Sequence, residues 1–207
     1  MKSILMIIFG LSLLCLGPAC GNDDDNGTGS SNGGNDTVVD SHPDPTKNIS
    51  LYGVSGLSGG KIPSGRTITL SLKVLNDYGS YVRGMTNGFR IYSPDGAQWG
   101  STSMDTTGTI GKEEFDLVVA IQYSSADGMG VDTVAFGASI MQASGIPNGF
   151  DEVALTIDIG PINSSYAGKH VCLDSCYRPP SYKWKWVVNE VTQYPTWDGP
   201  HCWEISN

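Results

Sequence analysis

The chain has 207 residues, with 12 Lys and Arg against 21 Asp and Glu, and its formal net charge at pH 7 is −9. This acid excess, without a basic stripe to meet phosphates, argues against nucleic-acid binding and against adhesion to anionic lipid. Only 16% of the residues are charged, against about 25% in an average soluble protein, and Gly, Ser and Thr are abundant instead, as is common in secreted β proteins.

Residues 1–19 have the pattern of a bacterial secretory signal. Lys2 precedes an apolar segment, residues 4–16, which is too short to cross a bilayer. Small residues then lead to Cys20 in the sequence LGPAC. This resembles the lipobox of bacterial lipoproteins, although Pro18 departs from its commonest form. The resemblance implies that Cys20 is diacylated through its sulfur and becomes the mature N-terminus. An ordinary secretory signal with a chance cysteine is the alternative.

Residues 20–48 are predicted to be a lipid-anchored tether. The segment is rich in Gly, Asn, Asp and Ser and has too few apolar residues to fold. As a random coil its 28 residues after Cys20 would span roughly 30 Å. Asp23, Asp24 and Asp25 resemble the acidic signal that sends some Bacteroidetes-type lipoproteins to the outer face of the cell. We therefore expect an outer-membrane protein exposed at the cell surface. The alternatives are that the acids only keep the tether extended, and that the protein faces the periplasm.

Residues 49–207 are predicted to form one all-β domain. Apolar and polar residues alternate with a period of two, turn signals separate the segments, and no helical period of useful length occurs. The expected strands are 49–54, 66–74, 88–92, 115–123, 133–140, 151–159, 168–173, 183–188 and 200–206. Eight or nine such strands predict an antiparallel β-sandwich, with a barrel as the less favoured alternative.

The alternation also predicts which side chains face the core. In 66–74 they are Ile68, Leu70, Leu72 and Val74, and in 115–123 they are Phe115, Leu117, Val119, Ile121 and Tyr123. The order of strands and turns, from GRTITLSLKVLND through NGFRIYSPDGAQW to VALTIDIG, resembles the immunoglobulin-like sandwiches of cohesins and carbohydrate-binding modules. The motifs YSPDGAQW, GIPNGF, CLDS and WDGPHC also resemble a family of uncharacterised bacterial secreted proteins over most of 50–205. These resemblances imply a sandwich and carry over no binding residue.

Three cysteines of this domain lie near two histidines in the sequence. His170, Cys172 and Cys176, with His201 and Cys202, have a spacing that a tetrahedral zinc site accepts. In an oxidising compartment, however, neighbouring thiols pair. The favoured interpretation is a Cys172–Cys202 disulfide, with Cys172–Cys176 as the rival pairing. Cys176 would then be the odd cysteine, as a reactive thiol or an intermolecular link.

No catalytic motif is convincing in the sequence. Gly56–Gly60, GLSGG, fits the nucleophile-elbow pattern but is followed by a turn and a strand instead of a helix. Glu113, Glu114 and Asp116 could supply the carboxylate pair of a glycoside hydrolase, yet acids before a strand are usually solvated. We therefore expect a protein that is not an enzyme.

No cofactor is predicted, with a structural calcium ion as the alternative. Asp95, Asp127 and Asp132 stand in turn-like sequences that could offer carboxylate ligands. No loop approaches the full oxygen count of a calcium site, and aspartates in such sequences more often make turns.

Four of the five tryptophans lie in residues 182–203. Trp184 and Trp186 share one face of an expected strand, which predicts that they are buried. Other rings stand in turns beside Pro and Asp, where exposed rings stack on sugars or anchor protein partners. These candidate ligand-binding residues are Trp99, Tyr182, Tyr194 and Trp197. The alternative is that the turn aromatics cap the open end of the sandwich.

The sequence thus predicts a non-catalytic envelope lipoprotein whose β-sandwich binds carbohydrate. A cohesin-like protein-interaction or adhesion module is the alternative, and a glycoside hydrolase is the remote one. A coplanar row of exposed rings would favour sugar as the ligand. A flat, mixed, apolar sheet face would favour a protein partner.

Overall fold

The structure is a computed structural model, and it describes residues 46–107, 115, 117–123, 131–140, 144–176 and 184–207. The signal segment, Cys20, most of the tether, Asp127, Tyr182 and the acids at 113, 114 and 116 lie outside these residues. The predicted boundaries of the signal and tether therefore stay predictions. In the described part of the chain, no helix is long and apolar enough to cross a membrane.

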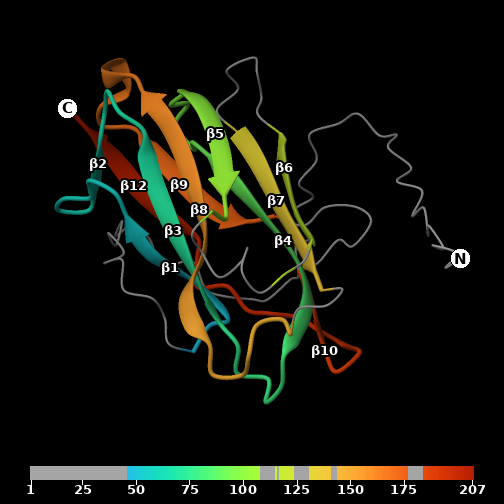
Figure 1. Cartoon of the computed structure of the whole chain (residues 1–207). Helices are drawn as coiled ribbons and strands as arrows, with labels where there is room; N and C mark the ends of the chain where they lie inside the picture. Colours follow the sequence, from blue (N-terminus) through green and yellow to red (C-terminus); the bar gives the residue numbers. More distant parts are fainter. Residues whose placement is uncertain (1–45, 108–114, 116, 124–130, 141–143, 177–183) are drawn as a thin grey trace, which may run out of the picture.

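Two β-sheets pack face to face (Figure 1). The four-stranded sheet has the order β1 (Ile49–Val54), β3 (Ile68–Leu75), β8 (Asp151–Ile162), β5 (Trp99–Asp105). The eight-stranded sheet has the order β11 (Val191–Gln193), β10 (Lys185–Val188), β4 (Val82–Tyr92), β9 (His170–Ser175), β12 (His201–Ser206), β2 (Lys61–Pro63). Its remaining strands, β7 (Val131–Ser139) and β6 (Leu117–Tyr123), extend from the other side of β4. Among the described strands, β12 and β2 are the one pair that runs parallel.

The predicted antiparallel β-sandwich is confirmed, but it has more strands than expected. The described residues form twelve strands and one short 3-10 helix, η1 (Ser164–Tyr166). Sequence reasoning missed β2 and β11 because each has only three residues. It missed β5 because WGSTSMD has polar residues at most positions, as suits a strand at the edge of its sheet.

The core lies between the sheets and follows the alternation of β3. Ile68, Leu70, Leu72 and Val74 are each at most 1% exposed, while the residues between them are only half-buried, so the predicted inner face is confirmed. Each fully buried Leu or Ile side chain contributes about 1.5–3 kcal/mol relative to an exposed one.

Of the predicted inner face of 115–123, Phe115 is buried, as expected. Strand β6 pairs with β7 along its whole length, with positions 118, 120 and 122 opposite Ala138, Phe136 and Val134. The side chains at 117, 119, 121 and 123 lie outside the part that the structure describes, so their predicted inward direction stays a prediction.

Strand β4 carries two different neighbours along one edge. Its first half pairs with β10, and its second half pairs with β9. Where they diverge, the carbonyl of Gly88 accepts hydrogen bonds from the Cys176 N–H and the Trp184 indole, both at 2.8 Å. A Cβ atom at position 88 would lie 2.6 Å from the Cys176 carbonyl oxygen, so only glycine fits.

Candidate binding surface

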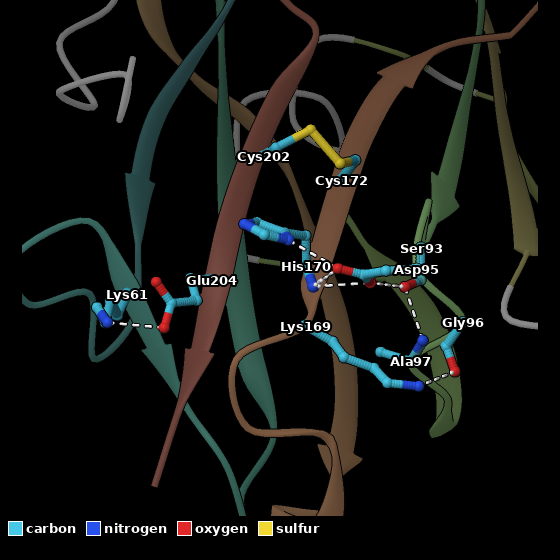
Figure 2. Close-up of polar contacts among 10 residues, drawn as sticks. All are labelled: Lys61, Ser93, Asp95, Gly96, Ala97, Lys169, His170, Cys172, Cys202 and Glu204. Atoms are coloured by element: carbon cyan, nitrogen blue, oxygen red, sulfur yellow. Dashed lines mark hydrogen bonds and ion pairs between the residues drawn. A yellow bond between two sulfur atoms is a disulfide. The ribbon is translucent and has the colours of Figure 1, made fainter. Parts of the chain in front are cut away.

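Cys172 and Cys202 form a disulfide between directly opposed positions of β9 and β12, with an S–S distance of 2.08 Å (Figure 2). The zinc alternative is therefore wrong, because the two sulfurs are bonded to each other. Cys176 is buried, 3% exposed, and its N–H donates to the carbonyl of Gly88 at 2.8 Å. Across the described residues, no group of three or more His, Cys, Asp or Glu could hold a metal ion.

Asp95 ties the turn after β4 to the start of β9 (Figure 2). Its carboxylate accepts hydrogen bonds from the His170 N–H at 2.9 and 3.0 Å and from the Ser93 hydroxyl at 2.9 Å, and lies 2.8 Å from the His170 ring nitrogen Nδ1. Partial burial alone would raise the pKa of Asp95, but the hydrogen bonds from His170 and Ser93 outweigh it and lower the pKa below 3.8. Asp95 thus makes the turn that its sequence suggested.

The second calcium candidate, Asp132, is also engaged by protein donors. It is 4% exposed and lies on β7, facing β5 of the other sheet. It accepts hydrogen bonds from the Trp99 indole at 2.7 Å and from the Thr102 hydroxyl. These contacts link the two sheets along this side of the sandwich.

On the outer face of the sheet, the carboxylates around the disulfide form ion pairs with basic side chains of that face. Glu204 lies 2.7 Å from Lys61, and Asp174 lies 2.8 Å from Arg90. With the Asp95–His170 pair, each of these three carboxylates has a basic partner. This part of the face therefore offers little unmatched charge to a ligand.

The predicted aromatic ligands are not brought together by the fold. Trp99 is half-buried at one edge of the four-stranded sheet, and its indole N–H is used by Asp132. Trp197 is partly buried, with its ring 5.5 Å from Phe89 and 5.9 Å from Trp184. Tyr194 is 58% exposed beside β11, at an edge of the other sheet. Tyr182 lies outside the described residues.

The segment 196–198 fastens the first strand of the domain. The Ile49 N–H donates to the Thr196 carbonyl at 3.0 Å, and the Asp198 N–H donates to the Ile49 carbonyl at 3.2 Å. The Asp198 carboxylate accepts the Leu51 N–H at 3.1 Å and lies 2.8 Å from Nε2 of His201. The aromatic-rich C-terminal stretch is therefore core in its strands, as expected of Trp184 and Trp186, and largely structural in this loop.

The exposed large apolar side chains gather elsewhere, around the β10–β11 hairpin. We call Tyr81, Val187, Val191 and Tyr194 the hairpin corner; they are 45%, 39%, 56% and 58% exposed. Val187 lies opposite Gly84 of β4 and Thr192 of β11, and Tyr81 immediately precedes β4. Of these four, sequence reasoning found only Tyr194. The other three follow from the pairing of β10 with β4, which no local pattern revealed.

The hairpin corner also has a free strand edge. Asn189 and Glu190, the two residues between β10 and β11, have φ of 48° and 64°, as a type I′ hairpin turn requires. The Ser80 hydroxyl donates to the Asn189 side-chain oxygen at 2.7 Å and holds the turn against the segment before β4. Among the described strands, β11 pairs only with β10. Figure 1 shows β10 at the end of the sandwich away from the C-terminus.

Comparison with known proteins gives similarities of fold only. No protein-family model matches the sequence, and neither does any curated protein. A type II cohesin domain from the cellulosome of Acetivibrio cellulolyticus has a TM-score of 0.49 and 12% identity, covering 76% of this chain and 95% of that chain. A type III cohesin module from the cell-surface anchoring scaffoldin ScaE of Ruminococcus flavefaciens has a TM-score of 0.42 and 14% identity, covering 84% and 92%.

A third similar structure is the sixth cohesin from scaffoldin B of Acetivibrio cellulolyticus, in complex with a mutant Cel5 dockerin. It has a TM-score of 0.44 and 11% identity, and the match covers 70% of this chain and 93% of that chain. At such identities, and with TM-scores below 0.5, these similarities assign no partner and no function to this chain.

Proposed function

We propose that this chain is a non-catalytic, lipid-anchored envelope protein whose β-sandwich binds a protein partner at the hairpin corner. The observation that carries the proposal is the distribution of exposed apolar side chains. Four of the five large hydrophobic side chains that are exposed in the described residues belong to this corner. Single exposed apolar residues are ordinary, whereas several of them around one strand edge are typical of protein-interaction sites.

Carbohydrate binding, the first expectation from the sequence, has less support. Sugar sites of this kind need rings that lie exposed together, so that they stack on the C–H faces of the ligand. Trp99 and Trp197 are partly buried and face different partners, and only Tyr194 of the described candidates is exposed. The corner is a mixed surface of valines and tyrosines beside a strand edge, which suits a polypeptide better.

The membrane anchor is part of the same proposal. Cys20 would carry the lipid, and the tether would hold the sandwich away from the outer membrane, at the cell surface. Mass spectrometry of the mature N-terminal peptide tests this step, since diacylation adds the mass of a diacylglycerol to Cys20. An unmodified Cys20, or Cys20 recovered in a disulfide, would contradict it.

Site-specific photo-crosslinking on intact cells tests the binding function. A photoreactive residue in place of Val191 should give a discrete adduct with one protein, which mass spectrometry then identifies. The matched control places the same residue at Ser103, an exposed position on β5 of the opposite sheet, and should give none. Equal labelling from both positions, or binding of the mature protein on a glycan array that is lost in Tyr194→Ala, would overturn the proposal.

A further inference from the structure

We infer that the partner contributes an extended, acidic and apolar segment that adds to the free edge of β11 as a new strand. This rests on the proposed protein-binding function and names the chemistry of the partner. Three features of the hairpin corner carry it: an open backbone edge, apolar side chains on both sides of that edge, and cations without a carboxylate partner.

The open edge is centred on Thr192. Val188 and Val191 flank the two-residue turn, and in such hairpins the flanking residues exchange hydrogen bonds. The next pair, Val187 and Thr192, is then the non-hydrogen-bonded pair. The N–H and C=O of Thr192 therefore point away from β10, toward the side where no described strand lies. An extended peptide can use these groups as it does in other cases of strand addition.

Apolar side chains lie on both faces of this edge. Val187 is on the outer face of the sheet, opposite Thr192. Val191 pairs with the buried Val188 and so belongs to the inner face, yet it is 56% exposed because the sheet ends there. A strand added to β11 would cover Val191 with the side chains of its inner face, and would meet Thr192, with Val187 one strand farther in, on its outer face. Apolar residues at alternate positions of the partner segment would supply the contact with Val191.

The charge at this corner differs from that of the chain as a whole. Lys185 of β10 is partly exposed and Arg83 of β4 is exposed, and no ion pair of either appears among the described residues. Glu190, in the turn, is the one carboxylate of the hairpin. In a chain with a net charge of −9, this corner is thus a local excess of cations. Asp or Glu side chains in the partner segment would find free cations here.

Peptide selection against the intact mature protein tests the inference. The probe is a phage library of random 12-residue peptides, panned on the lipidated chain in detergent micelles. Enriched peptides should alternate apolar residues and contain more Asp and Glu than the library. Their affinity should fall roughly tenfold or more in Lys185→Glu and stay unchanged in Lys47→Glu, which makes the same charge change at the start of the domain.

The backbone contact is tested separately at position 192. Thr192→Pro removes an N–H that points outward, so the β10–β11 ladder keeps its bonds, and peptide binding should be lost. Thr192→Ala keeps the N–H and should bind as the unaltered protein does. Circular dichroism and thermal unfolding of both variants show that the sandwich is intact.

Three results would overturn the inference. Selected peptides without an acidic excess would show that the partner chemistry is wrong. Equal binding by the Pro and Ala variants at position 192 would show that no strand is added. In either case a crosslink from Val191 would still support a protein partner at the corner. If no enriched peptide binds the Val191→Asp variant more weakly than the unaltered protein, strand addition to β11 is wrong. If the crosslink from Val191 is absent as well, the proposed function is also wrong.

Discussion

Asp198 serves two buried groups with one carboxylate. Its side chain is 3% exposed and binds the Leu51 N–H and the His201 ring, so it joins β1 to the segment before β12. Asp198→Ala would leave both groups buried and without this acceptor. We expect a loss of about 2–4 kcal/mol in the free energy of unfolding, measured by urea denaturation. Asp198→Asn keeps an acceptor and should cost less, and equal losses in both variants would contradict this account.

Asp95 predicts an acid-dependent contribution to stability. Its pKa in the folded state is lowered, so the carboxylate stabilises the fold at pH values above the unfolded pKa near 3.8. This contribution is lost as the pH falls through the folded pKa, below that value. It should be under about 1 kcal/mol, because the side chain is 37% exposed. The difference in the free energy of unfolding between the wild type and Asp95→Asn should be largest at pH 6 and shrink as the pH falls below 3.8; a constant difference would exclude this origin.

At the scale of elements, the β10–β11 hairpin has an identifiable strain. Glu190 has a φ of 64°, a left-handed conformation that costs a residue with a Cβ atom about 1 kcal/mol. Glu190→Gly creates the preferred Asn-Gly turn and should raise the free energy of unfolding by about 0.5–1 kcal/mol. Glu190→Ala removes the same charge without relieving φ and should give no gain. If the two variants have equal stability, the turn conformation is not the cause.

The disulfide between β9 and β12 stabilises a pairing that the strands already make. It closes a loop of 30 residues, which in the chain-entropy model contributes about 3–4 kcal/mol by restricting the unfolded chain. The double variant Cys172→Ala, Cys202→Ala should lose that amount in urea denaturation while circular dichroism still shows the sheet. A loss of the sheet signal at zero denaturant would mean that the disulfide is required for folding itself.

The elements that could be predicted from the sequence are those whose pattern is local. β1 has its predicted bounds, and β3 differs only at its ends, because turns flank them and one face is apolar. The inner face of β6 could not be predicted with the same security, because LVVAIQY is largely apolar at both sets of alternate positions. Likewise, the sequence could not show that β10 pairs with the first half of β4 and β9 with its second half, because both strands are far from β4 along the chain.

In the candidate binding surface, too, only the features with a local signal in the sequence could be predicted. Tyr194 could be found from its turn, and the disulfide from compartment and spacing, because both arguments need only nearby residues or simple counts. Tyr81 and Val187 lie more than a hundred positions apart in the sequence and meet at the hairpin corner through strand pairing. Trp197 looked exposed because it stands in a turn, but the turn packs against the core.

At the scale of the whole molecule, the two ends of the domain hold each other. The first strand, β1, is bonded to residues 196–198, and β2 pairs with the last strand, β12. The disulfide then joins β12 to β9 in the middle of the eight-stranded sheet. If the domain is tethered through its N-terminus, the tether therefore joins it at β1, a strand that hydrogen bonds connect to the C-terminal part of the domain.

The tether itself leads to a prediction about where the molecule resides. If Asp23, Asp24 and Asp25 act as an export signal, changing all three to Asn should move the lipidated protein from the cell surface to the periplasmic face. Protease digestion of intact cells measures the exposed share, which should fall severalfold. The matched control changes Asp36, Asp40 and Asp44 to Asn, which removes the same three charges farther along the tether. If the acids only keep the tether extended through charge repulsion, the two triple variants will behave alike, and the export interpretation is wrong.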